Sequence, residues 1–548
     1  MARPTALCLL ALMLVSCGTG SPETVLVGRV WTGNPDQPWA EAVAVRGETV
    51  LLVGDSLVVL ALVGAGTEVV RVGAGLITPG FQDNHTHFVQ GGFQLSWVDL
   101  RDADTPEEFT RRIGAHARTL APGEWILGGD WDHELWPSAP LPRRDWIDSV
   151  TPDNPVLVSR LDGHMALANT AALVAAGITA ASAEVSGGTI VRGPDRAPAG
   201  VFKDAAMGLV ARVVPPPSPA QLDSAVARGM AHAATVGVTG ISFVSATWPE
   251  VAALRRAEGA GAMTLRVSAY PWFSDWRAVA ETVKVRGPGT AWLRVAGVKG
   301  MVDGSLGSTT AWFHQPYLDQ PATAGLTVTP IDSVAAWVGA ADSAGLQVIV
   351  HAVGDRANDV LLGIFDSVAT AHGPRDRRFK IEHAQHLSRE AMARFAALGV
   401  IPSMQPYHAI DDGRWAEKRI GPERIRTTYA FRTLLDAGAA LSFGSDWTVA
   451  PLNPMLGIDA AVSRRTIDGR NPDGWVPQER ITVEEALRAY TVANSYGVFG
   501  EATTGMLKQG YQADLLVIDR DITSVAPEEI GAARVSRTMV AGRTVFRR

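Results

Sequence analysis

Short apolar runs separated by polar turn residues open and close this chain of 548 residues. The runs are rich in Val and Gly and short, which is typical of antiparallel strands. The sequence therefore predicts two β-rich ends, residues 23–78 and 505–548, and we expect them to pair as one small β-sandwich. The runs are Val25–Val30, Ala42–Val45, Val50–Val53, Ala513–Asp519 and Thr538–Phe546.

A different pattern fills the middle of the chain, where apolar strand-like runs alternate with Ala-rich helical stretches. Such alternation favours parallel strands with helical crossovers, an α/β fold. Eight such runs are present, the number in a (β/α)8 TIM-like barrel, which we place at residues 79–504. They are Leu76–Phe81, Gly237–Val244, Leu265–Tyr270, Leu293–Val298, Gln347–Val350, Phe379–Ile381, Val400–Met404 and Ala440–Phe443.

The alternation of strand-like and helical stretches stops after the first of these strands. Residues 88–219 lack the strand–helix alternation, and the segment Pro215–Pro219 marks where it resumes. We interpret this stretch as a large insertion that serves as a lid or a substrate-specificity domain. The length and the 47% hydrophobic composition are ample for a large buried core.

The first residues have the features of an export signal. Arg3 precedes the apolar stretch Ala6–Val15, which is too short to span a bilayer. The sequence Leu14-Val15-Ser16-Cys17-Gly18 resembles a bacterial lipobox, in which Cys17 carries the acyl chains. We therefore expect residues 1–17 to be a lipoprotein signal peptide and the protein to be lipid-anchored in the cell envelope, at the outer membrane or periplasmic face. The alternative is an ordinary signal peptide with a chance cysteine.

Charge and cysteine content narrow the range of partners. The formal charge is -7 and no long basic run is present, so the sequence gives no reason to expect a nucleic-acid partner. A small-molecule substrate is the simpler expectation, and the oligomeric state, a homodimer included, stays open. Besides Cys17 the chain has one cysteine, Cys8, inside the signal. A metal in the mature domain must therefore use His, carboxylate or modified Lys.

Five candidate metal ligands follow apolar runs at the points where parallel strands end. Barrel enzymes place catalytic groups at these ends of their strands. Any one of these residues could be a hydrogen-bonded structural residue, but five of them at four strand ends indicate a metal site. Imidazole and carboxylate suit zinc and similar divalent ions. The five residues are His85, His87, His351, His383 and Asp446.

This order of residues resembles the amidohydrolase superfamily, and finer motifs resemble its YtcJ-like branch, the relatives of N-substituted formamide deformylase. The resemblance extends over the whole mature chain. It implies a hydrolase that cleaves a carbon–nitrogen bond other than a peptide bond, in a small amide or formamide-like substrate, by metal-activated water. The motifs are Gly80–His87, Asp162–Asn169, Lys299–Ser308, His351–Ala357, Ile381–Gln385 and Gly444–Trp447.

Lys299 follows the fourth run, where many binuclear members of the superfamily carry a carboxylated lysine between two metals. The resemblance therefore implies that a carbamate on Lys299 holds one or two zinc ions together with the five ligands. The alternative is a lysine paired with a nearby acid such as Asp303. In that case one metal is held by His85, His87, one or both of His351 and His383, and Asp446.

Further roles are assigned to residues around this centre. Asp446 is expected to take a proton from the attacking water and deliver it to the departing nitrogen. His164, in the insertion, is a candidate oxyanion or substrate donor, or else a residue that stabilises its loop. Trp131 and Asp132 either line the pocket or pack the insertion. We expect the substrate contacts to come from Trp131, Asp132, Asp303 and Ser305.

Two other functions compete with amide hydrolysis. The same barrel and metal could support deamination or ester hydrolysis, because fold and metal do not fix the leaving group. A solute-binding lipoprotein without catalysis is the third interpretation. The joint presence of the five ligands argues against it, because binding alone has no need of a water-activating set.

Overall fold

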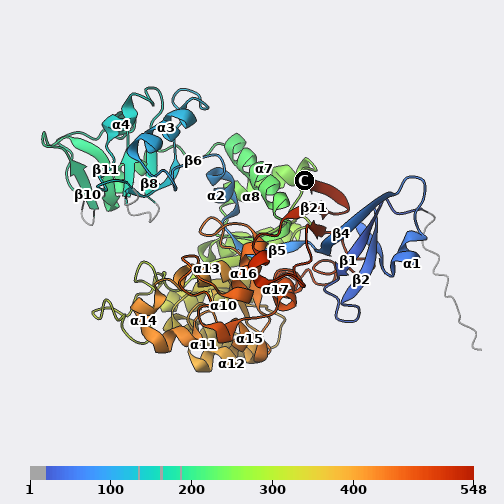
Figure 1. The fold of residues 1–548 in the computed structure, drawn as a ribbon. Helices are drawn as coiled ribbons and strands as arrows, with labels where there is room; N and C mark the ends of the chain where they lie inside the picture. Colours follow the sequence, from blue (N-terminus) through green and yellow to red (C-terminus); the bar gives the residue numbers. More distant parts are fainter. Residues whose placement is uncertain (1–19, 134–135, 161–164, 186–187) are drawn as a thin grey trace, which may run out of the picture.

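The structure is a computed structural model that describes residues 20–133, 136–160, 165–185 and 188–548, so Cys17 and His164 lie outside the described residues. The described residues form four β-sheets, and most of the helices surround the sheets in the middle of the molecule (Figure 1). Among the described residues, no helix combines the length and the apolar character that a membrane span requires.

A seven-stranded sheet joins the two ends of the chain. The β1 strand pairs with β4 in parallel, and β4 pairs with β20 from the C-terminal end in antiparallel fashion. In spatial order the strands are β22 (Arg543–Arg547), β21 (Val535–Val540), β20 (Leu515–Ile518), β4 (Glu68–Pro79), β1 (Thr24–Trp31), β2 (Trp39–Arg46) and β3 (Thr49–Gly54).

The period-2 pattern of β1 explains why both faces of this sheet carry apolar residues. Val25 packs with Val59 of the short helix α1 (Ser56–Leu60) on one face. Leu26 and Val30 pack on the other face against the C-terminal segment, which includes Leu515. The pairing of the two chain ends follows from this second apolar cluster.

Two parallel sheets form the centre of the molecule. The four-stranded sheet has the order β14 (Leu293–Arg294), β13 (Arg266–Tyr270), β12 (Val238–Val244) and β5 (Phe81–Thr86). The five-stranded sheet has the order β15 (Gly297–Met301), β16 (Gln347–Ala352), β17 (Lys380–His383), β18 (Ile401–Met404) and β19 (Ser442–Phe443). Single parallel bridges connect the two sheets on both sides, from Trp272 to Lys299 and from Thr86 to Trp447.

Two of the predicted strands were placed wrongly. The run Leu76–Phe81 is divided, because β4 ends at Pro79 in the seven-stranded sheet and the strand beside β12 is β5. The run Leu293–Val298 is also divided, because β14 pairs with β13 whereas β15 pairs with β16. Lys299 therefore lies inside β15 and does not follow a strand.

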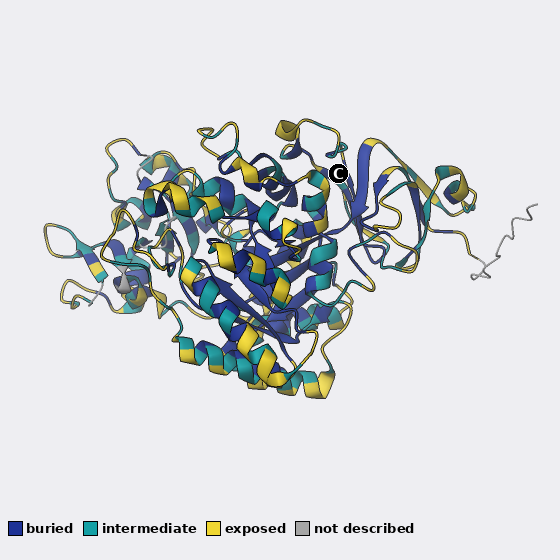
Figure 2. Ribbon diagram, turned by 90° about the horizontal axis from the view of Figure 1, so that it is seen from below, coloured by how far each residue is buried: buried dark blue, intermediate teal, exposed yellow. Residues whose placement is uncertain are grey.

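Helices pack around the two parallel sheets, with buried residues toward the strands and exposed residues on the outer faces (Figure 2). The helices of this body are α2 (Phe88–Gln94), α7 (Pro219–Thr235), α8 (Trp248–Gly259), α9 (Trp276–Arg286), α10 (Ile331–Ser343), α11 (Asp355–His372), α12 (Arg389–Leu398), α13 (Pro406–Asp412), α14 (Ala416–Arg424), α15 (Phe431–Asp436), α16 (Pro454–Ser463), α17 (Val483–Ala489), α18 (Val492–Gly497) and α19 (Pro527–Ile530).

The segment after α2 builds a separate six-stranded sheet, which projects from the body as its own lobe (Figure 1). Its apolar clusters contain residues from Val98 to Val210, whereas Phe88 and Val89 of α2 belong to the large central core. The strands and helices are β10 (Gly188–Arg192), β11 (Pro198–Asp204), β9 (Met165–Ala168), β8 (Leu157–Arg160), β7 (Gly128–Trp131), β6 (Val98–Asp99), α3 (Pro106–Ala117), α4 (Arg144–Asp148), α5 (Thr170–Ala176) and α6 (Gly208–Ala211).

Candidate metal centre

A cavity of about 690 Å³ opens where the parallel strands end. Its polar lining comes mostly from residues at or just beyond the C-terminal ends of these strands, because the carboxyl ends of parallel strands meet on one side of the sheets. The side chains that bear on metal chemistry are His85, His87, Lys299, His351, His383, His408 and Asp446.

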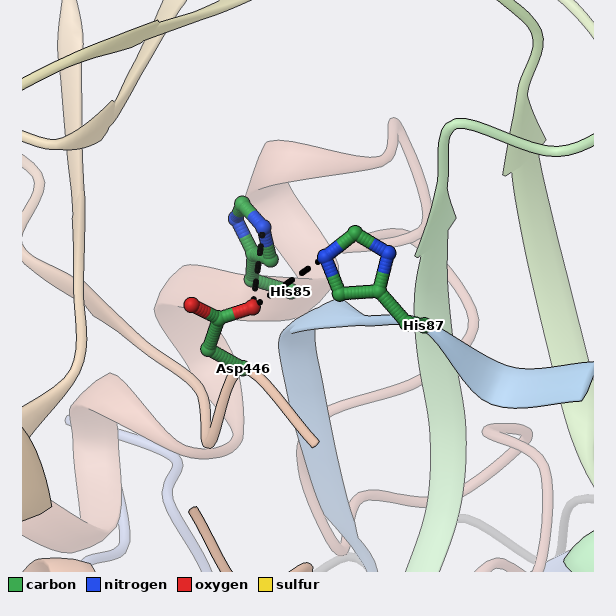
Figure 3. Close-up of side chains that lie close together, drawn as sticks. All are labelled: His85, His87 and Asp446. Atoms are coloured by element: carbon green, nitrogen blue, oxygen red, sulfur yellow. Dashed lines mark ion pairs between the residues drawn. The ribbon is translucent and has the colours of Figure 1, made fainter. Parts of the chain in front are cut away.

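His85, His87 and Asp446 converge on one point (Figure 3). His85 is the fifth residue of β5, and His87 follows that strand directly. The Nε2 atom of His85 lies 3.4 Å from Oδ1 of Asp446, and the Nε2 atom of His87 lies 3.3 Å from the same oxygen. The two imidazoles and the carboxylate thus present three ligand atoms to a common centre.

In both His85 and His383, the ring nitrogen Nδ1 faces a buried hydrogen-bond acceptor. Nδ1 of His85 lies 2.5 Å from Oε2 of Glu382, which also accepts a hydrogen bond from Ser403. Nδ1 of His383 lies 2.7 Å from Oε1 of Gln405. A buried acceptor on one ring nitrogen fixes the ring and leaves the other nitrogen for a metal, which is the usual arrangement around metal-bound histidines.

The backbone around Asp446 is tied to β5. Its N–H donates to the carbonyl of His85 at 2.8 Å, and the buried carboxylate of Asp83 accepts hydrogen bonds from the N–H groups of His85 and Ser445. Asp446 (φ 58°) and His383 (φ 75°) both have left-handed backbone conformations. Such strain costs about 1–3 kcal/mol at each residue and is concentrated at functional sites.

Asp446 is ionised at neutral pH. Burial works against its charge, but the neighbouring imidazoles of His85, His87 and His383 hold its pKa well below the usual range. Its side chain is almost fully buried, and among the described residues its Oδ1 atom has no hydrogen-bond partner. A buried anionic oxygen without a donor is costly unless a cation satisfies it.

The donor set fits a divalent cation. His85, His87 and Asp446 form one group of potential ligands, and His383, His408 and Asp446 form a second that shares the same carboxylate. Within each group all ligand atoms lie within 4.8 Å of one another. Nitrogen and oxygen donors of this kind suit zinc and other first-row divalent ions.

Lys299 lies next to this centre. It is 2% exposed, and its Nζ atom lies 3.4 Å from Nε2 of His85. Burial lowers the pKa of the Lys299 amine. The predicted alternative partner, Asp303, is engaged elsewhere, since its carboxylate accepts hydrogen bonds from the backbone N–H groups of Trp312, Val353 and Gly354 at 2.7–2.9 Å.

His351 lines the cavity, but its Nε2 atom lies 3.0 Å from the carbonyl oxygen of Gly304 and 3.6 Å from Asp303. In the part of the chain that the structure describes, neither group of potential ligands includes it. Asp303 lies outside the lining of this cavity, because its side chain is fully buried and its carboxylate accepts hydrogen bonds from backbone N–H groups; its contact with substrate stays a prediction. Ser305, also predicted to contact substrate, does line the cavity.

Trp131 and Asp132 lie in the six-stranded lobe and outside the lining of this cavity. The Trp131 side chain is fully buried in the core of the lobe, and its Nε1 donates to the carbonyl of Val158. Asp132 accepts a hydrogen bond from Arg160 at 2.8 Å. The structure thus agrees with the packing alternative for Trp131 and gives neither residue a contact with the cavity.

The sequence analysis missed His408. This residue lies on α13, four positions beyond the end of β18, and its ring is stacked with that of His383 at a centroid distance of 6.4 Å. The sequence signal that could have identified His408 is its position shortly after the seventh apolar run. The six predicted metal ligands lie inside a strand or within three residues of its end, so a histidine on the following helix went unnoticed.

Comparisons with known proteins agree with this geometry. The chain is 35% identical over 531 residues to the Arabidopsis thaliana protein LONG AFTER FAR-RED 3, with 95% of this chain and 90% of that protein covered. It is 28% identical to the putative amidohydrolase YtcJ of Bacillus subtilis, with 88% and 90% covered. It is 27% identical to N-substituted formamide deformylase of Arthrobacter pascens, with 92% and 94% covered.

A solved structure extends the likeness to the fold. An uncharacterized metal-dependent hydrolase from Pyrococcus horikoshii superimposes with a TM-score of 0.77 at 27% identity, covering 92% of this chain and 99% of that chain. The sequence profile of the amidohydrolase family matches residues 73–546. With an α/β metal-dependent hydrolase fold and relatives of the YtcJ-like branch, the chain belongs to the amidohydrolase family.

Proposed function

We propose that this metal-dependent hydrolase cleaves the carbon–nitrogen bond of a small, non-peptide amide such as a substituted formamide. The observation that carries the proposal is the buried carboxylate of Asp446, whose Oδ1 atom faces His85 and His87 at the cavity and has no hydrogen-bond partner. One relative, N-substituted formamide deformylase, is named for this chemistry, which supports the choice of bond.

The residues that would hold the metal are His85, His87 and Asp446, with His351, His383 and Lys299 around them. A divalent ion, which we propose to be zinc, would lower the pKa of a water molecule to near neutrality and polarise the carbonyl group of the amide. A carbamate on Lys299 would allow two ions, and its place beside His85 Nε2 supports this proposal.

Asp446 is the general base and acid of the proposed reaction. Its ionised Oδ1 accepts a proton as water attacks the carbonyl carbon, and the same oxygen returns the proton to the nitrogen as the carbon–nitrogen bond breaks. Glu382 keeps His85 oriented throughout. The apolar side chains of Phe243, Trp272 and Leu306 form part of the cavity wall and could contact an apolar substituent of the substrate.

The division of the chain into a barrel, a β-sandwich and an insertion is proposed as well. We infer that the two parallel sheets, linked by single bridges on both sides, act as one (β/α)8 barrel over residues 79–504. Residues 23–78 and 505–548 would form the accompanying small β-sandwich, and residues 88–219 the insertion. A separate hydrophobic core in the six-stranded lobe supports the last assignment.

We further propose that acyl chains on Cys17 anchor the protein in a bacterial envelope, at the outer membrane or the periplasmic face. The described chain starts at Gly20, beside the seven-stranded sheet and on the side away from the six-stranded lobe (Figure 1). An anchor there would leave the cavity free. Cys17→Ser should move the protein from the membrane fraction to the soluble fraction, and unchanged fractionation would contradict the proposal.

The experiment for the reaction compares matched substrates with one apolar substituent: a formamide, the corresponding formate ester and an amidine. The mature protein is assayed as isolated, after chelation, and after zinc is restored. We expect release of formate and amine from the formamide, loss of turnover on chelation, and recovery with zinc. Turnover of the ester or amidine alone would reject the proposed bond. Tight binding of the formamide without turnover by the zinc-loaded protein would indicate a solute-binding protein.

A further inference from the structure

We propose that His408 is a catalytic residue that donates a hydrogen bond from Nε2 to the carbonyl oxygen of the substrate; this rests on the proposed function. His408 lines the cavity, and its ligand atom lies within 4.8 Å of those of His383 and Asp446. A substrate carbonyl placed next to Asp446 for attack is therefore within reach of this imidazole.

The contacts of His408 differ from those of His85 and His383. His85 and His383 each have Nδ1 held by a buried acceptor, Glu382 or Gln405. Within the described chain no such acceptor is found for His408, and its Nε2 atom is buried without a hydrogen-bond partner. Metal-bound imidazoles usually have an acceptor on the second nitrogen. The unheld ring of His408 therefore fits a substrate donor better than a metal ligand.

The helix that carries His408 is nevertheless fixed in place. Further along α13, the carboxylate of Asp412 accepts hydrogen bonds from Gln385 Nε2 and from the Tyr429 hydroxyl, both at 2.7 Å. Gln405, just before the helix, is bound to His383. The position of His408 relative to the centre is thus set before substrate arrives, as preorganised stabilisation of a transition state requires.

The proposed role of His408 follows from the atom on which negative charge develops during the reaction. Attack of water on an amide carbonyl moves negative charge onto the carbonyl oxygen, and a fixed N–H donor at that oxygen stabilises the transition state more than the ground state. Loss of a single donor of this kind lowers kcat by about 10²–10³-fold. His164 was the sequence-based candidate for this role and lies outside the described residues.

Two variants test the inference. His408→Ala removes the donor, whereas His408→Asn keeps a side-chain N–H. We expect His408→Ala to lower kcat on the formamide about 10²-fold or more, with bound metal per protomer unchanged. His408→Asn should recover a substantial part of that loss. His314→Ala is the control, because His314 is a surface histidine that pairs with Asp359.

A second readout does not depend on turnover. Phenylphosphonate offers tetrahedral oxygens like those of the reaction intermediate, and its affinity is measured for the wild type and for His408→Ala. We expect the variant to bind it at least tenfold more weakly. Equal kcat and equal affinity, including no binding by either protein, would overturn the inference. Loss of a metal equivalent would also overturn it, since His408 would then be a ligand.

Failure of the proposed function has a different signature. It would appear as a zinc-loaded wild type that turns over none of the amides. The phosphonate affinities of the wild type and His408→Ala would then still decide the role of His408.

Discussion

The polar side chains at the strand ends and those in the six-stranded lobe differ in how fully their atoms are bonded. At the strand ends, Asp446 Oδ1 and His408 Nε2 are buried and lack hydrogen-bond partners in the part of the chain that the structure describes. In the lobe, Trp131 donates to a backbone carbonyl and Asp132 is bound by Arg160. Residues of both regions were sequence-based candidates for the functional site.

The difference indicates which polar residues await a ligand. A buried polar group without a partner costs free energy, so such a group in the wall of a cavity is a good candidate for contact with a ligand. A polar group whose hydrogen bonds are already made within the protein stabilises the fold and has few free donors or acceptors for a substrate. By this criterion we expect the chemistry at the strand ends and a packing role for Trp131.

The largest expected effect comes from one substitution made in both regions. Asp446→Asn removes the proton acceptor and a ligand, so kcat/KM on the formamide should fall by about 10⁴-fold. Asp132→Asn, in the lobe, should leave kcat/KM within about twofold, because it lies outside the cavity lining. Steady-state kinetics of both variants measure the contrast. A large loss in Asp132→Asn would place the lobe in the reaction.

The next comparison uses two buried lysines of the five-stranded sheet, one in β15 and one in β17. Lys299→Ala should reduce bound metal from two equivalents to one or none, because Lys299 lies beside His85. Lys380→Met should keep the metal content, since the Lys380 amine lies over the ring of Tyr270 and has no hydrogen-bond partner within the described residues. Elemental analysis per protomer checks both variants. One equivalent that Lys299→Ala does not change would favour a single metal and a structural lysine.

A smaller effect on zinc affinity is expected from substituting a residue that orients a metal ligand. Glu382→Gln weakens the acceptor that orients His85, so zinc affinity should fall about 10–100-fold, as for other residues that support metal ligands. Glu479→Gln is the matched control, because Glu479 is a buried carboxylate bound to Thr433 away from the cavity. Competition with a chromophoric chelator measures both affinities. Equal affinities would show that Glu382 does not act through His85.

Much of this centre was predictable from sequence. The apolar runs located β12, β13, β16, β17, β18 and β19 within a few residues, and the polar residues at their ends identified His383 and Asp446. That success has a physical origin. Strands buried on both faces are continuous apolar runs, and a polar residue at their carboxyl end has few structural reasons to be there.

The errors arose where tertiary pairing overrides local pattern. Leu76–Pro79 is as apolar as a central strand, but its partners are β1 and β20 of the seven-stranded sheet. Trp131 and Asp303 were candidates for contact with substrate, and only the packed structure shows the backbone groups that bond to their side chains. Periodicity along a chain contains no information about such distant partners.

The smallest expected effect tests whether the lobe is merely structural. Trp131→Phe removes a buried hydrogen bond to Val158 and leaves a small void, so unfolding free energy should fall by about 2 kcal/mol. Because Trp131 does not line the cavity, kcat/KM should stay within about twofold. Trp272→Phe, in the cavity wall and 38% exposed, should instead change KM and leave thermal stability nearly constant. If Trp131→Phe lowered kcat/KM tenfold at unchanged stability, the lobe would have to contact the substrate during turnover, as the lid interpretation requires.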